Sequence, residues 1–325
     1  MIPPIYVDAI IWSSLYVLLS LGLTLTYLTT KVPNFAHGMF ATAGAYVTLT
    51  VREVWNANIY HYLYLAFIIV GIIALAQYLL VLRPLMRKGT STVGLMITTL
   101  AIDIILFAVL NIYADYVKTA FKIPYERDFY FRRYDFKIAG QDGLLIVAPT
   151  LAAVIVTLLH LALTRTKFGV AMRAAIEDPS LASVVGINVN FVYAVSWFTA
   201  GGLAGLAGAL IPLRLMSSPN TGWLLIVSMF AASIVGGLLN IYGAVLGGFL
   251  IGLAVKLVPF YLAPRIGTWI HRYEQLIPLI AMAVTLLIVP KGLLGADWRG
   301  MMRAIRGLTA RLRFGRVRAR IKGNS

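Results

Sequence analysis

The side chains able to do chemistry in this sequence are few, and their spacing assembles no familiar catalytic centre. There is no cysteine, which excludes a disulfide framework, a zinc–thiolate site and a cysteine nucleophile. The four histidines are scattered, and the patterns HExxH, GxSxG and GxxxxGK[ST] do not occur. We therefore expect no catalytic residues, no metal and no cofactor. Any energy that the protein uses must come from a partner or an ion gradient.

The polar groups of interest interrupt long apolar stretches. The run Pro33-Asn34-Phe35-Ala36-His37-Gly38 opens one of them. It makes a poor lipid-facing helix, because polar backbone at membrane depth is tolerated only inside protein or against a water-filled cavity. We expect a broken or re-entrant helix beside a pathway, or alternatively a helix that Asn34 and His37 cap at the inner interface. Asp103, in the middle of a later stretch, is expected to line the pathway or to be neutral and buried.

The amino-acid composition indicates the kind of protein in which these polar groups lie. Hydrophobic residues make up 60% of the 325 residues and charged residues only 12%, about half the ~25% of soluble proteins. At a mean hydropathy of +0.85, a water-soluble globule would have to hide more apolar surface than its shape allows. The chain is therefore an integral membrane protein. A soluble enzyme, a disordered chain and a disulfide scaffold are excluded.

The apolar stretches predict an all-α, polytopic helical bundle of about nine spans, because a helix needs about 20 apolar residues to cross a bilayer. The predicted spans are residues 7–29, 35–52, 60–82, 92–113, 144–163, 189–213, 221–239, 242–262 and 275–290. They form one transmembrane domain, 1–290, followed by a basic tail, 291–325. Gln77, His160 and Lys256 lie nearer span ends and are expected at the membrane interface.

The distribution of basic residues orients this multi-pass bundle in the cell membrane. An odd number of spans puts the termini on opposite sides. With the C-terminus inside, most of the 28 Lys and Arg residues fall in inner segments, as the positive-inside rule requires. We therefore expect a cytoplasmic tail and an N-terminus outside. The tail is expected to lie on anionic membrane lipid and not on nucleic acid.

Two glycine-rich stretches indicate close helix packing, because small residues let backbones approach. Gly201, Gly205 and Gly208 share one helical face, and Gly243 and Gly247 stand four residues apart. Packing within the chain is expected, or alternatively a seam between subunits or a moving interface.

The inner loop 164–190 is longer than the other inner connections. It can form two short amphipathic helices broken at Asp178-Pro179, with Asp178 or Ser180 capping the second. The loop is expected to lie on lipid or to dock a soluble partner. Its mixed charge disfavours plain lipid adhesion, which prefers Lys/Arg faces.

Several blocks, taken together and in order, resemble one family. They are NFAHG with GAY (34–46), RPLMRKG (83–89), RAAIEDPSLASVVGIN (173–188), FTAGGLAGLAGAL (198–210), GGLLNIYGAVLGG (236–248) and PKGLLG (290–295). They are similar to the permeases of branched-chain amino acid ABC transporters, a family of binding-protein-dependent transport permeases, and are most similar to the LivH type. Asp103 and the aromatic outer loop 115–142 depart from the family pattern and leave the substrate open.

The resemblance implies a transport subunit and not an enzyme. Its expected partners are a second, LivM-type permease subunit, two cytoplasmic ABC ATPases that hydrolyse ATP, and an extracytoplasmic substrate-binding protein that delivers branched-chain or related amino acids. It also implies roles for matching positions: the membrane pathway for Asn34, Phe35, His37 and Gly38, and ATPase coupling for Arg173, Glu177, Asp178 and Gly186. Permeases for urea and short-chain amides share these motifs. A self-sufficient secondary transporter or membrane enzyme is the alternative of another class.

Overall fold

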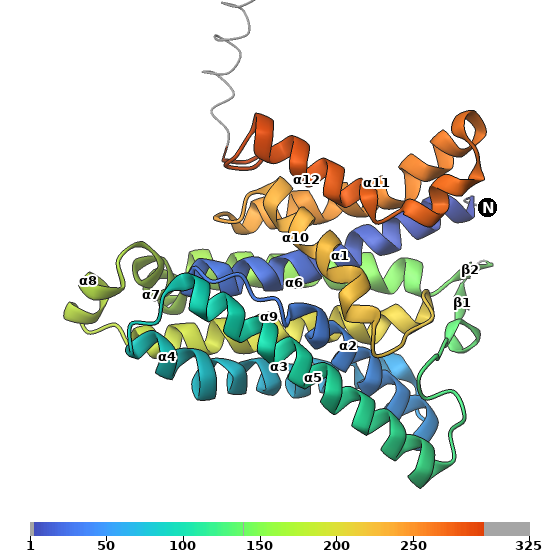
Figure 1. Ribbon diagram of the computed structural model, residues 1–325, viewed down its shortest axis with the longest axis horizontal. Coiled ribbons are helices and arrows are strands. Elements are labelled where there is room, and N and C mark those ends of the chain that lie inside the picture. Colours follow the sequence, from blue (N-terminus) through green and yellow to red (C-terminus); the bar gives the residue numbers. More distant parts are fainter. Residues whose placement is uncertain (1–2, 139, 296–325) are drawn as a thin grey trace, which may run out of the picture.

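The computed structural model describes residues 3–138 and 140–295, and almost all of that part is helical (Figure 1). The helices are α1 (Pro4–Thr30), α2 (His37–Leu49), α3 (Leu63–Ala76), α4 (Arg83–Arg87), α5 (Thr92–Phe121), α6 (Leu144–Arg165), α7 (Lys167–Glu177), α8 (Pro179–Val184), α9 (Val189–Leu210), α10 (Thr221–Gly236), α11 (Ile241–Ile266) and α12 (Leu276–Ile288). The two-residue strands β1 (Lys137–Ile138) and β2 (Gln141–Asp142) pair antiparallel. The predicted all-α bundle is confirmed for the described residues, while the basic tail from residue 296 lies outside them.

Short π- and 3₁₀-helical pieces join several of these helices. The π-helical segments are η1 (Thr50–Val54) and η3 (Gln77–Leu82), and the 3₁₀ segments are η2 (Ile59–Tyr62), η4 (Arg132–Tyr134), η5 (Ile211–Leu213) and η6 (Thr268–Tyr273). Because η2, α3, η3 and α4 follow one another without a break, they form one long helical rod, Ile59–Arg87.

Six helical segments in the described part are long and apolar enough to cross a membrane, so the predicted count of nine is not confirmed. They are Pro4–Thr30, Ile59–Arg87, Thr92–Phe121, Leu144–Arg165, Val189–Leu213 and Ile241–Ile266. α10 and α12 are apolar but shorter, with 16 and 13 residues. At about 1.5 Å per residue, helices of this length fall short of the ~30 Å hydrocarbon core.

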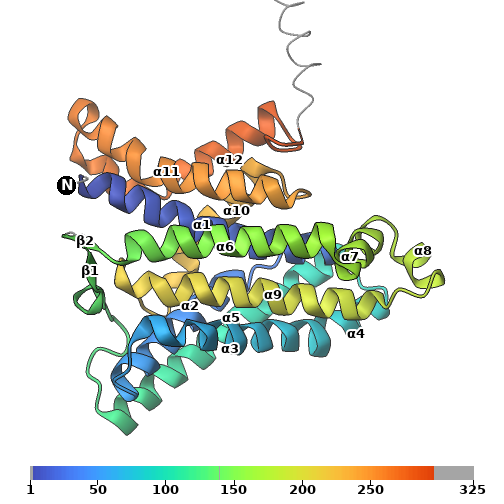
Figure 2. The same cartoon turned by 180° about the vertical axis from the view of Figure 1, so that it is seen from behind.

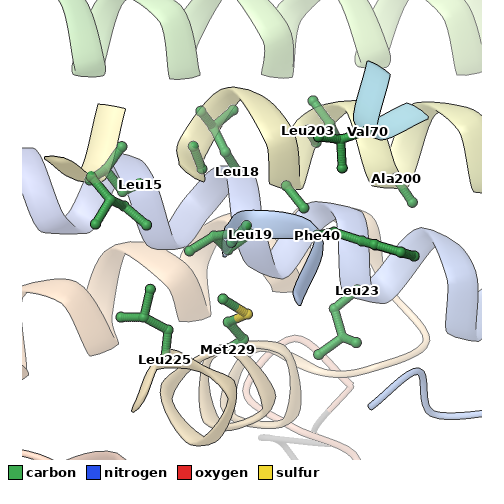
Figure 3. Packing of buried hydrophobic residues seen from close by; sticks show 14 of the residues in the cluster. Leu15, Leu18, Leu19, Leu23, Phe40, Val70, Ala200, Leu203, Leu225 and Met229 are labelled. Carbon is green, nitrogen blue, oxygen red and sulfur yellow. The ribbon is translucent and has the colours of Figure 1, made fainter. Parts of the chain in front are cut away.

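Helix α1 is the centre of the bundle. Of its most apolar stretch 94% is buried, against 22% for α5 and 17% for α6, which lie at the periphery. Figure 3 shows leucines pointing from α1 toward Phe40 of α2, Leu203 of α9 and Met229 of α10. A helix that is apolar on every side is expected to be buried on every side. The burial of α1 on all sides therefore follows from its own sequence.

Helices α2 and α10 both begin inside the bundle. His37, the first residue of α2, lies against Leu19 and Gly22, near the middle of α1. The first turns of α2 and α10 meet at Gly38 and Gly222. From this meeting point α2 runs toward the end of the bundle that holds the N-terminus, and α10 runs toward the opposite end (Figure 1). The shortness of the two helices follows from these interior starting points.

The ends of the described chain lie at opposite ends of the bundle (Figure 1). Helices α7 and α8 project from the end opposite the N-terminus, as Figure 2 shows from the other side. The last described residues pack at that same end, where the Leu293 N–H donates to Val235 O at 2.8 Å. The β1–β2 hairpin and the loop that precedes it cover the end with the N-terminus.

Candidate functional site

The break between α1 and α2 carries non-helical backbone into the interior. α1 ends at Thr30, and Lys31 takes a left-handed conformation with φ 54°. Residues 32–36 then run without helical structure to His37. Such backbone needs partners inside protein, and Thr99 of α5 lies beside it. The Phe35 N–H donates to Thr99 Oγ1 at 3.3 Å. The single Thr99 hydroxyl proton is shared between Met96 O at 2.8 Å and Pro33 O at 3.3 Å. The Phe35 ring packs on Phe230 of α10, with centroids 5.2 Å apart.

Asn34 is fully buried and hydrogen-bonded to Gln77. Gln77 Nε2 donates to Asn34 Oδ1 at 3.0 Å. Gln77 is only 5% exposed and is the first residue of the π-helical segment η3, so its expected place at the membrane interface is wrong. The helical rod continues ten residues beyond Gln77, to Arg87, and this places Gln77 at depth. Asn34 Nδ2 and Gln77 Oε1 keep no hydrogen-bond partner among the described residues.

His37 is also fully buried. Its Nε2 lies 3.0 Å from Leu19 O. Because a carbonyl only accepts, Nε2 carries the proton and Nδ1 is an acceptor, which has no partner among the described residues. A Cβ on Gly22 would lie 2.9 Å from the ring, so only glycine leaves room for it. No side chain caps the first turn of α2.

Gly38 and Gly222 make the contact between α2 and α10. A Cβ on Gly38 would lie 2.6 Å from Gly222 O, and a Cβ on Gly222 would lie 2.5 Å from Gly38 O. Beside this contact, Trp223 Nε1–H donates to Asp103 Oδ2 at 2.7 Å, and its ring stacks on Phe107 with centroids 4.3 Å apart. Asp103 is 7% exposed, and its Oδ1 has no partner among the described residues.

The structure therefore places the five residues predicted for the pathway around the starts of α2 and α10. We call Asn34, His37, Gln77, Thr99 and Asp103 the central polar cluster. All five residues of the central polar cluster are buried. Sequence reasoning missed Thr99 and Trp223 and misplaced Gln77. The sequence did contain one signal for the start of α10. A Pro-Asn pair followed by a glycine precedes both helices, as Pro33-Asn34 with Gly38 and as Pro219-Asn220 with Gly222. The cluster offers hydrogen-bond donors and acceptors and no paired nucleophile and base.

The residues predicted for coupling lie on α7, at the junction between α7 and α8, and in the turn after α8. Arg173 donates from its guanidinium to Leu163 O, and Glu177 is the last residue of α7. Asp178 Oδ1 accepts from the N–H groups of Ser180 and Leu181, both at 2.9 Å, so the expected cap of the second helix is confirmed. Gly186 has φ +86°, a conformation that favours glycine after a helix end.

The glycines predicted for packing face other helices of this chain. A Cβ on Gly201 or Gly205 would meet α3, at Val70 O and Ala66 O, and one on Gly208 would meet Ala41 O of α2. A Cβ on Gly243 or Gly247 would meet α10, at Gly236 O and Ala232 O.

Comparison with known proteins identifies a family that the chain matches. The chain matches the family described as branched-chain amino acid transport system, permease component, over residues 5–289. A probable branched-chain amino acid transport permease protein LivH of Methanocaldococcus jannaschii is 44% identical over 297 residues, which cover 91% of this chain and 94% of that protein.

More distant relatives have similar names. The high-affinity branched-chain amino acid transport system permease protein BraD of Pseudomonas aeruginosa is 26% identical over 89% of this chain and 94% of its own length. The LivH protein of Escherichia coli K12, described in the same words, is 25% identical over 87% of this chain and 92% of its own length. No solved structure is significantly similar to the chain.

Proposed function

This chain belongs to the family of branched-chain amino acid transport system permease components, and on that premise we propose that it is the membrane-spanning permease subunit of an ABC importer for branched-chain or related amino acids. The observation that carries the proposal is the family match over residues 5–289 together with the 44% identical relative. The homologues are transport permease components, which supports the role of a transport subunit for this chain. Its apolar helices agree with a multi-pass membrane protein.

The proposed partners are two cytoplasmic ATPases, a second permease subunit of the LivM type and an extracytoplasmic substrate-binding protein. We place the N-terminus outside the cell and the C-terminus in the cytoplasm. The projecting helices α7 and α8 would then face the cytoplasm and dock on an ATPase. In support, α8 and its C-cap present apolar side chains to solvent: Leu181, Val184 and Val185 are 61%, 82% and 68% exposed. Single exposed apolar residues are ordinary, but a cluster on a projecting helix favours a protein partner.

The proposed pathway passes the central polar cluster. Unpartnered buried polar atoms are unusual in folded proteins and are often functional. Of the ten such side-chain atoms among the described residues, four belong to the cluster: Asn34 Nδ2, His37 Nδ1, Gln77 Oε1 and Asp103 Oδ1. The starts of α2 and α10 add backbone N–H groups and the positive ends of two helix dipoles. Transporters use the starts of discontinuous helices at mid-membrane to bind anionic substrate groups. Opening of the Gly38–Gly222 contact would expose this cluster.

Uptake measurements test the proposal. The full chain is purified with the proposed ATPase, permease and binding-protein partners and reconstituted in vesicles. We expect uptake of labelled leucine that requires ATP on the ATPase side and the binding protein on the other. A catalytically dead ATPase is the control. ATP-dependent uptake of urea or acetamide in place of leucine would overturn the substrate class. Leucine uptake driven by an ion gradient without the ATPases would overturn the importer assignment.

A further inference from the structure

A second polar site lies away from the central polar cluster. Lys256 of α11 and Glu274, between η6 and α12, form an ion pair with Nζ and Oε2 2.6 Å apart. Their side chains are only 21% and 30% exposed. They line a cavity of about 130 Å³ between α1, α10, α11 and the start of α12. Glu274 belongs to the turn at the end of the bundle that holds the N-terminus (Figure 1).

The cavity has a charged and aromatic side and an apolar side. Lys256 Nζ lies 5.4 Å from the centroid of the Trp12 ring, within the range of a cation–π contact. Tyr16, Ser228 and Gln275 complete the polar lining. Leu215, Leu224, Leu225 and Val255 form the apolar side.

The packing of α11 on α10 does not require this ion pair. Lys256 lies within the apolar span Ile241–Ile266, where an ionisable side chain is unfavourable in a membrane and is usually functional. A partly buried pair stabilises a fold little, because desolvation offsets most of the attraction between the charges. The pair joins α11 to the turn before α12, whereas α11 packs on α10 through glycines such as Gly236 and Gly243. The pair therefore calls for another explanation, and the cavity beside it supplies one.

We propose that this cavity binds a free α-amino acid in its zwitterionic form, with an apolar side chain. The ligand carboxylate would pair with Lys256 and its ammonium group with Glu274, while the side chain would lie on Leu215, Leu224 and Leu225. Without ligand the two charges neutralise each other. One water molecule needs ~10–15 Å³ of such volume, so a cavity of about 130 Å³ has room for a ligand larger than a water molecule. The site deepens the proposed function, on which it rests, by giving the substrate a place on the permease.

Direct binding tests the site. The full chain, purified with its co-purifying subunits but without the binding protein, is placed in nanodiscs of phosphatidylglycerol. We expect saturable binding of labelled L-leucine. Isoamylamine, which lacks the carboxylate, and 4-methylpentanoate, which lacks the ammonium group, should not compete. Lys256→Met and Glu274→Gln should each weaken binding about tenfold or more, because each leaves one ligand charge unpaired. Lys118→Met is the matched control, since it breaks the outer Lys118–Glu126 pair, 3.1 Å long, and should leave binding unchanged.

A charge swap separates ligand binding from a structural role. Lys256→Glu combined with Glu274→Lys keeps an ion pair but moves the cation away from Trp12. We expect this variant to fold, as judged by its yield and thermal stability, and to bind leucine at least about tenfold more weakly. Wild-type binding in the swapped variant or in both single variants would overturn the proposal. So would competition by phosphatidylethanolamine, a zwitterionic lipid, without competition by leucine.

Uptake measurements separate the proposed binding site from the proposed permease function. ATP-dependent leucine uptake by the wild-type complex, with no leucine binding that depends on Lys256, would overturn the site and leave the permease function standing. Leucine binding that depends on Lys256 and Glu274 supports the site, whatever drives uptake.

Discussion

At the scale of single residues, the central polar cluster is notable for what it leaves unpaired. An unpaired buried polar group costs about 1–3 kcal/mol, and four side chains of the cluster each carry such an atom. A structural network would be expected to satisfy them. The four side chains come from the break before α2, from α2, η3 and α5 and gather near the starts of α2 and α10, which favours a ligand pathway.

The first prediction at this scale concerns His37. We expect His37→Leu to assemble with its partners but to lose most leucine uptake, about tenfold or more, because both ring nitrogens disappear from the proposed pathway. The stability loss should be small, since the Leu19 carbonyl lies inside α1 and keeps its helical bond. His37→Gln, which retains an N–H donor, should recover part of the uptake.

Uptake per assembled complex is the measurement for this series. His61→Leu, at an exposed histidine, is the control. Wild-type uptake in His37→Leu would remove this residue from the pathway, and a loss of assembly would show that its role is structural.

The second prediction concerns the Asn34–Gln77 hydrogen bond. Asn34→Leu or Gln77→Leu alone leaves one amide unpaired and should lower the free energy of unfolding by about 1–3 kcal/mol. The double variant should lose less than the sum of the two, with a coupling energy of about 0.6–1.7 kcal/mol. Denaturant titration in detergent measures all four proteins. Asn111→Leu, which removes a separate bond to Phe107 O, should be additive with Gln77→Leu. Additivity of Asn34→Leu with Gln77→Leu would contradict the bond.

At the scale of elements, the two short helices explain how a polar site is held at depth. α2 and α10 begin at one point and run in opposite directions. Glycine at positions 38 and 222 lets their backbones touch, and a larger residue at either would hold the two first turns apart. The site therefore depends on a contact between helices that are more than 180 residues apart in sequence.

The third prediction tests that contact. Gly38→Ala and Gly222→Ala should each lower stability by about 1–3 kcal/mol, because the new methyl group would meet backbone that cannot move aside. The control is Gly94→Ala near the start of α5, where a Cβ would meet only the flexible side chain of Thr90 and Ser91 Oγ. Thermal unfolding of the purified complexes is the measurement. Equal stability of the Gly38→Ala and Gly94→Ala proteins would mean that the contact is not tight.

The fourth prediction concerns the proposed coupling helices. Reversing the charge of Asp178 would also remove the cap of α8, a loss of about 1 kcal/mol. Glu177→Lys combined with Asp178→Asn avoids this, because asparagine is an equally good cap. We expect normal membrane abundance and reduced co-purification of the ATPases.

The matched control for the coupling variant is Asp128→Lys, at an exposed position in the loop at the other end of the bundle. Intact co-purification and uptake in the Glu177→Lys/Asp178→Asn protein would remove α7 and α8 from energy coupling.

At the scale of the whole molecule, the sequence predicted features that neighbouring residues determine better than contacts between separate elements. The cap at Asp178 is a matter of neighbouring residues and followed from the sequence, as did the break at Pro33. Gln77 was misplaced because its depth was judged from the end of an apolar stretch, whereas the helix continues through η3 and α4 to Arg87. The Lys256–Glu274 ion pair and the Asp103–Trp223 hydrogen bond join elements whose relative positions no local sequence pattern encodes.

The last prediction concerns orientation. The chain has no cysteine, so single cysteines report without interference. Ser180, on α8, and Lys137, on β1, are both exposed and lie at opposite ends of the bundle (Figures 1 and 2). If the N-terminus is outside, an impermeant thiol reagent should label Lys137→Cys in intact cells and Ser180→Cys only after lysis. This follows from the sequence, in which the Lys and Arg residues of the inner segments outnumber those of the outer segments once the tail 291–325 is counted. Labelling of Ser180→Cys in intact cells would invert the bundle, and α7 and α8 could then no longer meet a cytoplasmic ATPase.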